Sequence, residues 1–283
     1  MALPSPSAWG VHATQYEQRA TSLYGRDALV LGDLPPPQGA TLLDVGCGPG
    51  EPALTAARMG YEVTAIDLST VMLDRLNERI AATADKLPIH VRLLDGETLE
   101  GVPDASFDVV TSMFGVFVFP HRDAAWQAAL RVLKPGGRLL ATSWDKSNTN
   151  GKMVRYVTQH AVDEREGPAE TMLTPSINRT VSADLWRDEL QENGFVDVRV
   201  HTVSHPLCFK SGEEYVVAVL DNPALTEMVG HKQPDSLRRT MLDFVQLVVD
   251  GIDPFSDDAK AAVARAGSGS AENHPLWRRP FTF

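Results

Sequence analysis

Short apolar runs alternate with longer amphipathic segments from residue 41 to about residue 145. The runs have the length and composition of buried strands, and the segments between them carry apolar residues at helical spacing. The expected strands are Thr41–Val45, Glu62–Ile66, Ile89–Leu93, Phe107–Met113 and Arg138–Ser143, and the expected helices are Pro52–Met59, Val71–Ala82 and Ala124–Leu133. This alternation predicts an α/β fold with a doubly wound, mostly parallel sheet that has helices on both faces.

The alternation of apolar runs and amphipathic segments is weaker outside residues 41–145. Three prolines, Pro35–Pro37, end a helical pattern over His12–Leu31, because proline cannot continue a helix. Ser182 precedes a predicted helix that ends at Asn193 and Gly194. The later segments are a predicted strand over Phe195–Val203, helical patterns over Ser211–Val249 and Ala259–Arg265, and a final edge strand within 273–283.

The charge balance excludes some partners. The formal net charge is −11, and no run of Lys and Arg is longer than two residues. Nucleic-acid binding needs a positive surface, so no nucleic-acid partner is expected. No apolar stretch reaches the roughly 20 residues that span a bilayer, and the first residues lack the pattern of a signal peptide. We therefore expect no membrane partner.

The two cysteines, Cys47 and Cys208, suggest neither a disulfide framework nor a metal site. We therefore predict no bound metal and a reducing compartment, the cytoplasm.

The most specific motif is the segment Leu42–Gly50, in which a strand runs into a glycine-rich turn that opens a helix. Such turns let backbone N–H groups approach a ligand closely. The dinucleotide fingerprint needs Gly or Ala at position 51, where this chain has Glu51. A carboxylate at the start of a helix would also repel a pyrophosphate. Asp44, at the end of the strand, suits a cationic ligand group better than a phosphate.

Asp67 closes the second predicted strand, 23 residues after Asp44. A carboxylate in this place accepts both hydroxyls of a ribose in nucleotide-binding folds. The alternative interpretation is an acid solvated at the end of a strand.

Five segments follow one another along the chain: Asp44–Gly50, Asp67, Asp95–Glu97, Ser106–Val110 and Arg131–Gly137. In this order they resemble the motifs of class I S-adenosylmethionine-dependent methyltransferases, within the small-molecule branch that includes the ubiquinone/menaquinone methyltransferases. The resemblance covers Thr41–Asp145 well and the rest loosely, and it implies a Rossmann-like core with a seven-stranded-type sheet.

The resemblance implies a role for each motif. The methionine part of the cofactor would be held by Asp44, Gly46, Gly48 and Gly50, the ribose by Asp67, and the adenine by Leu68, Asp95 and Gly96, with Met113 and Phe114 at the cofactor's edge. Lys134–Gly137 would form a structural turn into the fifth strand.

Two departures from related patterns matter. The residues after the fourth strand, Ser112–Gly115, differ from the Asn/Asp-Pro-Pro-aromatic motif of enzymes that methylate nucleobase amines. Where many relatives have Phe-Pro-Asp, this chain has His121 in place of the acid. A histidine near the methyl acceptor is a candidate general base, and a surface or capping role is the alternative.

Candidate substrate contacts lie outside the core. Tyr16 belongs to a segment that closes over the cofactor in similar enzymes, and Arg155 and Arg179 are suited to binding a substrate carboxylate. The alternatives are ordinary packing for the tyrosine and solvation for the arginines.

Taken together, the sequence predicts a methyltransferase that uses S-adenosylmethionine to methylate an O, N, S or C atom of a small molecule. The alternatives are an inactive cofactor-binding subunit and a nucleotide-dependent oxidoreductase. The 206–272 segment is predicted to be a lid, with a homodimer interface as the alternative. The predicted segments are a helical cap (1–40), the cofactor-binding core (41–145), an inserted cap segment (146–181), a return to the core (182–205), the helical lid (206–272) and the edge strand (273–283).

Overall fold

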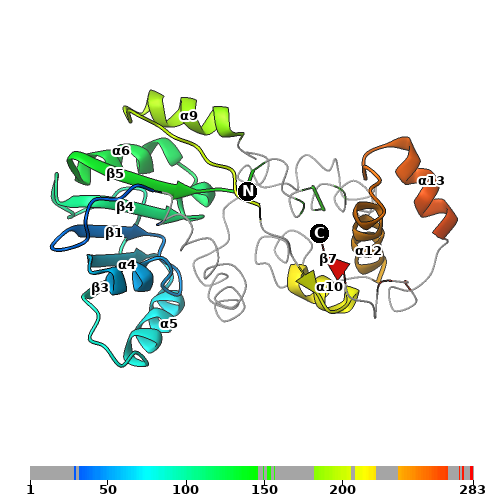
Figure 1. Cartoon of the computed structure of the whole chain (residues 1–283), viewed down its shortest axis with the longest axis horizontal. Coiled ribbons are helices and arrows are strands. Elements are labelled where there is room, and N and C mark those ends of the chain that lie inside the picture. Colours follow the sequence, from blue (N-terminus) through cyan, green and yellow to red (C-terminus); the bar gives the residue numbers. More distant parts are fainter. Residues whose placement is uncertain are drawn as a thin grey trace. The chain divides into compact units, whose positions relative to one another are not determined.

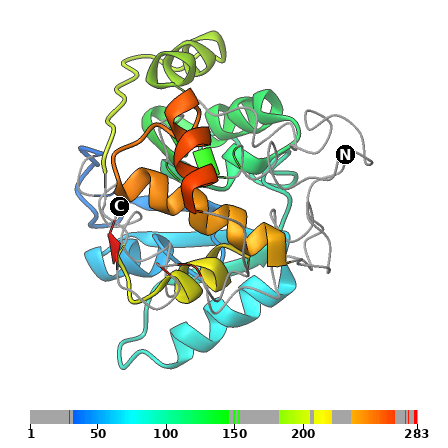
Figure 2. The same cartoon turned by 90° about the vertical axis from the view of Figure 1, so that its right-hand side faces the viewer.

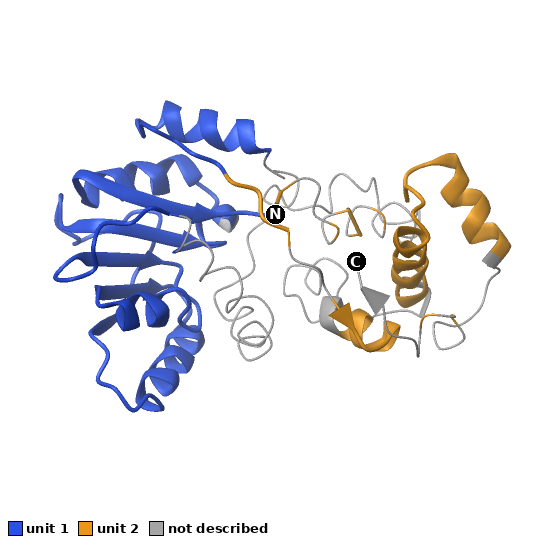
Figure 3. Cartoon of the chain, viewed as in Figure 1, with its two compact units in different colours: residues 1–144, 181–200 blue, residues 145–180, 201–283 orange. Residues whose placement is uncertain are grey.

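The computed structural model describes residues 29, 32–145, 149, 152–153, 156, 182–204, 208–220, 235–266, 274, 276 and 281–282 (Figure 1). The chain forms two compact units. Unit 1 contains Met1–Trp144 and Val181–Val200, and unit 2 contains Asp145–Thr180 and His201–Phe283 (Figure 3). Apart from Leu29, the helix expected over His12–Leu31 lies outside the described residues.

Unit 1 is built on a five-stranded sheet in the order β3-β2-β1-β4-β5, and every neighbouring pair is parallel (Figure 1). Leu43 of the central strand lies opposite Thr64 on one side and Val110 on the other. The strands are β1 (Thr41–Val45), β2 (Glu62–Asp67), β3 (Ile89–Leu93), β4 (Phe107–Met113) and β5 (Leu133–Thr142). The predicted doubly wound parallel sheet is confirmed.

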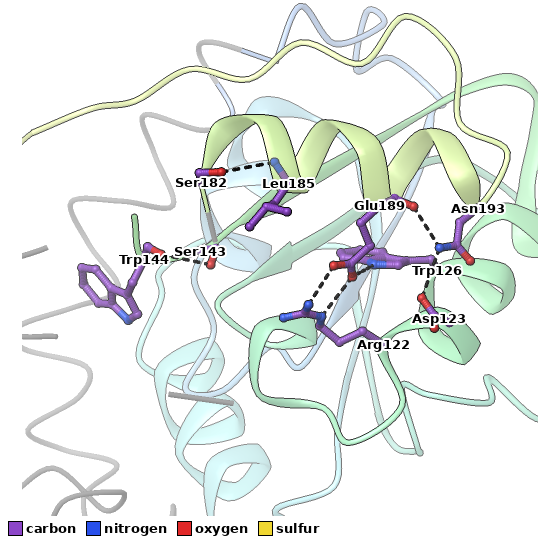
Figure 4. Close-up of polar contacts among 9 residues, drawn as sticks. All are labelled: Arg122, Asp123, Trp126, Ser143, Trp144, Ser182, Leu185, Glu189 and Asn193. Atoms are coloured by element: carbon purple, nitrogen blue, oxygen red, sulfur yellow. Dashed lines mark hydrogen bonds and ion pairs between the residues drawn. The ribbon is translucent and has the colours of Figure 1, made fainter. Parts of the chain in front are cut away.

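Helices cover both faces of this sheet. The helices α4 (Ala53–Met59) and α5 (Thr70–Ala81) pack on the face that contains Leu42, whereas α6 (Arg122–Val132) packs on the face that contains Leu43. Successive strand residues point to opposite faces, so a strand buried on both sides is apolar at consecutive positions. The last helix of the unit, α9 (Ala183–Glu192), begins at Ser182, whose hydroxyl accepts from the backbone N–H of Leu185 at 3.3 Å (Figure 4).

The structure corrects two expectations. The segment Lys134–Gly137 belongs to β5 as an irregularity, since pairing with β4 passes from Leu133 directly to Arg138. The strand predicted over Phe195–Val203 is wrong, because these residues have no strand conformation. Asp197 has a φ of 52° and interrupts an extended backbone. Among the described residues, the sheet of unit 1 therefore has five strands.

Unit 2 has its own apolar core, and its helices are coloured yellow to orange-red in Figure 2. Its helices are α10 (Gly212–Leu220), α12 (Asp235–Val249) and α13 (Asp257–Ala266), and β6 (Cys208–Phe209) pairs antiparallel with β7 (Phe281–Thr282). The stripe Leu237, Met241 and Val245 on α12 is buried in this core at helical spacing. The strand expected within 273–283 thus pairs in unit 2 and not with the parallel sheet. None of the described helices has the length and apolar character to cross a bilayer.

Candidate functional site

The candidate site lies in unit 1, where the strand order reverses between β1 and β4. The loops that follow these two strands leave the sheet in opposite directions, and ligands of doubly wound sheets bind at this switch point. The β1 loop carries the glycine turn, residues 46–50, and the β4 loop runs from Phe114 to the start of α6.

Two glycines of the turn, Gly48 and Gly50, have different structural roles. Gly48 has a φ of 50°, and a Cβ placed on it would meet no described residue within 4 Å, so this side of the turn is open toward the described part of the chain. A Cβ on Gly50 would lie 2.5 Å from Cδ1 of Leu76 on α5. The small size of Gly50 therefore allows α5 to pack closely, and Gly48 is the glycine that faces open space.

Asp44 is completely buried at the end of β1. The hydroxyl of Thr111 donates to its Oδ1 at 2.8 Å, whereas its buried Oδ2 has no hydrogen-bond partner among the residues that the structure describes. Burial raises the pKa of Asp44 to about 7, against the opposing effects of the Thr111 hydroxyl and the Ala53 backbone N–H. A buried carboxylate oxygen without a partner is costly. A cationic ligand group would satisfy it, as the sequence predicts.

Asp67 joins the end of β2 to the glycine turn. Its Oδ2 accepts from the backbone N–H of Gly48 and its Oδ1 from that of Ser69, both at 2.9 Å. Burial raises the pKa of Asp67, and these backbone donors oppose the increase. Each carboxylate oxygen has a second lone pair that can accept a ligand hydroxyl. The adjacent Leu68 is 48% exposed, which leaves an apolar side chain beside these acceptors.

The turn after β3 packs against the end of β1. Oδ1 of Asp95 accepts from the backbone N–H of Glu97 at 2.8 Å. A Cβ on the buried Gly96 would lie 2.6 Å from Cγ1 of Val45 and 2.9 Å from the ring of Phe119. Position 96 therefore has no room for a side chain, because the turn packs closely against Val45 and Phe119. The packing role of Phe119 has no signal in the sequence.

The loop after β4 has an unusual backbone. Met113 is buried, and Phe114 has a φ of 60°, the left-handed region that bulky residues rarely adopt. The backbone N–H of Phe114 donates to the Thr142 hydroxyl at 3.1 Å, and its ring stacks on Trp144. The hydroxyl of Ser112 donates to the Val45 carbonyl at 2.9 Å and thereby joins this loop to the glycine turn.

His121 lies on the surface, with 76% of its side chain exposed. Its Nδ1 lies 3.0 Å from Oε2 of Glu97, and its backbone N–H donates to Oε1 of the same residue at 3.0 Å. It stands at the N-cap position of α6, without a capping hydrogen bond from its side chain. This geometry favours the surface interpretation, and a role as general base stays a prediction.

Sequence reasoning missed Arg79, which holds the glycine turn from α5. Its Nη1 donates to the Pro49 carbonyl at 2.7 Å, and its Nη2 donates to the Glu51 carboxylate at 3.1 Å. The hydroxyl of Thr55 donates to the other oxygen of Glu51 at 2.7 Å. Glu51 is thus a paired structural acid. No sequence pattern shows this contact, because it spans 28 to 30 residues and depends on how α5 packs.

Other predicted residues fall elsewhere. Tyr16, Arg155 and Arg179 lie outside the described residues. Cys47 is buried, which raises the pKa of its thiol, and Cys208 is exposed; neither forms a disulfide among the described residues. Within the part of the chain that the structure describes, no group of three or more His, Cys, Asp or Glu side chains is arranged to hold a metal.

Comparison with known proteins identifies the family. Residues 43–141 match the family described as "Methyltransferase domain". The chain is 37% identical over 195 residues to the ubiquinone/menaquinone biosynthesis C-methyltransferase UbiE of Nitrobacter hamburgensis, a match that covers 63% of this chain and 76% of the relative. It is also 37% identical over 132 residues to the 27-O-demethylrifamycin SV methyltransferase of Amycolatopsis mediterranei, covering 46% of this chain and 47% of that protein.

The chain thus spans about half the length of the rifamycin relative. Among solved structures, the YcgJ protein of Bacillus subtilis has the same fold, with a TM-score of 0.56 at 17% identity over 91% of this chain and 94% of that one. The match to UbiE covers most of that enzyme, and the site residues follow the motif order that the sequence predicts. The chain belongs to the class I S-adenosylmethionine-dependent methyltransferases.

Proposed function

We propose that this protein transfers a methyl group from S-adenosylmethionine to a small-molecule acceptor, with the reacting atom of the acceptor left open among O, N, S and C. One observation carries the proposal. Within the described part of the chain, the buried Oδ2 of Asp44 has no hydrogen-bond partner, and Asp44 belongs to the strand that leads into the open glycine turn. A cationic ligand fits this acid, and a pyrophosphate does not.

The residues present fit the parts of the cofactor. The amino group of its methionine part would be held by Asp44 and the backbone of the glycine turn. The ribose would be held by Asp67, and the adenine would lie against Leu68 and near Asp95 and Gly96. When bound, S-adenosylmethionine supplies a methyl group that is activated by a positively charged sulfur.

The protein's own contribution is to hold two reactants in line and to exclude water. Asp67 and Arg79 fix the glycine turn from two sides, through Gly48 and Pro49, so the binding surface is ordered before a ligand arrives. Among the described site residues, His121, whose Nδ1 lies 3.0 Å from Oε2 of Glu97, is the candidate to take a proton from an acceptor that has one.

We also propose a cytoplasmic location without nucleic-acid partners. The support is the net charge of −11 and the presence of only two cysteines in the chain. An acidic surface repels polyanions at physiological ionic strength.

Adenosylhomocysteine binding tests the cofactor assignment. We expect adenosylhomocysteine to raise the melting temperature and NAD to leave it unchanged. Gly48→Ala should lower the affinity for adenosylhomocysteine by about tenfold or more in calorimetric titration, because the new methyl group enters the open side of the turn. Gly101→Ala is the matched control, since Gly101 also has a positive φ (73°) and open space around its Cβ.

Equal affinities of the two variants would contradict the cofactor site. Stabilisation by NAD alone would favour the oxidoreductase alternative. Tight adenosylhomocysteine binding without methyl transfer to any member of an acceptor panel would favour an inactive cofactor-binding subunit.

A further inference from the structure

Two aromatic rings meet at the ends of neighbouring strands in unit 1. Phe114 directly follows β4, and Trp144 lies two residues beyond the end of β5. Their ring centroids are 4.5 Å apart and their planes differ by 27°, a stacked arrangement. Both side chains are half-buried. The aromatic pair thus lies at the carboxyl ends of the two strands, the same end of the sheet that carries the candidate site.

The backbone places this pair beside the glycine turn. A Cβ on Gly115, the residue after Phe114, would lie 2.8 Å from the Val45 carbonyl oxygen and 3.4 Å from Cα of Gly46. The acids assigned to the ribose and adenine lie on the other side of β1, where Asp67 is the last residue of β2 and Asp95 follows β3. A cofactor whose adenine lies on that side therefore has its sulfur end toward Phe114.

Phe114 is held in a backbone conformation that is energetically unfavourable. Its φ of 60° is unfavourable for a bulky side chain, and the Thr142 hydroxyl holds the backbone N–H in this conformation. Strained backbone of this kind persists where surrounding structure enforces it, and it clusters at ligand sites.

We propose that the stacked rings of Phe114 and Trp144 recognise the positive sulfonium of S-adenosylmethionine by a cation–π interaction, an inference that rests on the proposed function. The face of an aromatic ring carries negative potential and attracts cations. A carboxylate would attract the sulfonium as well, but it is itself a nucleophile toward an activated methyl group. An aromatic face stabilises the charge without this side reaction.

The interaction distinguishes the methyl donor, S-adenosylmethionine, from its product, adenosylhomocysteine. Loss of the methyl group leaves adenosylhomocysteine with a neutral sulfur, so the rings no longer attract it by charge. The pair therefore favours binding of the donor over binding of the product, and it assists release of the product after each turnover.

Calorimetric titration of the full chain with S-adenosylmethionine and with adenosylhomocysteine tests the proposal. The measured quantity is the ratio of the two dissociation constants, because contacts that the two ligands share cancel in it. Trp144→Leu and Phe114→Leu should each reduce the preference for S-adenosylmethionine by about three- to thirty-fold. Trp144→Phe, which retains a ring, should keep most of the preference. Phe195→Leu, which removes a ring three residues after the end of α9, should leave the ratio unchanged.

An unchanged ratio in both leucine variants, with adenosylhomocysteine binding intact, would overturn the inference and leave the proposed function standing. Failure of the unaltered protein to bind adenosylhomocysteine would overturn the proposed function instead. If Trp144→Leu does not fold, Phe114→Leu decides the question, because leucine and phenylalanine are equally strained at a φ of 60°.

Discussion

Asp44 links the charge state of the protein to the occupancy of its site. In the ligand-free chain, burial favours the protonated acid, and the pKa of Asp44 is raised from 3.8 to about 7. A cationic ligand group beside Oδ2 favours the ionised carboxylate instead. Ligand binding at pH values below about 7 should therefore release a proton from this residue.

Asp44→Asn makes this linkage measurable. Because the pKa of Asp44 is higher in the folded chain than in the unfolded one, its contribution to stability is fully present below about pH 4 and is lost as the pH rises through about 7. The melting temperature of the unaltered protein, relative to that of Asp44→Asn, should fall between pH 4 and pH 7 and level off above. Affinity for adenosylhomocysteine should rise over the same interval in the unaltered protein only. Parallel pH profiles for the two proteins would rule out this role.

At the residue scale, the sequence predicts which side chains surround the site but not what each contacts. Asp44 and Asp67 are recognisable because each ends a strand in a motif of fixed spacing. The packing role of Gly50, the left-handed conformation of Phe114 and the contact of Arg79 with the turn are not recognisable. Each of them depends on a neighbour brought close by the fold, such as Leu76 against Gly50.

At the element scale, α9 is attached to α6 by a buried polar cluster (Figure 4). The carboxylate of Glu189 accepts from Nε and Nη2 of Arg122 at 3.0 and 2.7 Å and from Nε1 of Trp126 at 2.8 Å. Asn193, just after the helix, donates to Asp123 at 3.3 Å. Arg122 is only 7% exposed, so its charge depends on Glu189 for compensation.

Glu189→Gln should destabilise the protein by about 3 kcal/mol, because it leaves the buried guanidinium of Arg122 without a counter-charge. Glu192→Gln makes the same change on the exposed surface of the same helix, and it should alter stability by no more than about 0.5 kcal/mol. Urea denaturation of both variants measures the difference. Equal stabilities would mean that the ion pair does not hold α9 in place.

The elements themselves were predictable to different extents. Strands β1, β3 and β4 have the bounds that the sequence pattern indicates. Burial on both faces leaves a continuous signal in β1 and β4, whereas the edge strand β3 is mostly exposed. The segment Phe195–Val203 has the alternation of a strand, but Val196 is 83% exposed and Asp197 has a positive φ. Alternation alone does not show whether a partner strand is available.

At the scale of the whole molecule, the chain passes between the two units after residues 144, 180 and 200. The predicted lid over 206–272 includes α10 and α12, and its function stays a prediction. If this segment is a lid, amides of residues 212–220 and 235–249 should gain protection from hydrogen exchange when adenosylhomocysteine is added. Protection that increases with protein concentration and does not change when the ligand is added would identify a dimer interface instead.

The position of α9 in the sequence has a consequence for synthesis. All five strands of the parallel sheet have left the ribosome once residue 144 has emerged, but Glu189 follows 45 residues later. At about 5–20 residues per second, the nascent sheet waits for several seconds with the surface of α6 around Trp126 uncovered. During that interval the emerging chain presents an apolar surface and an uncompensated arginine, which is the kind of surface that chaperones bind.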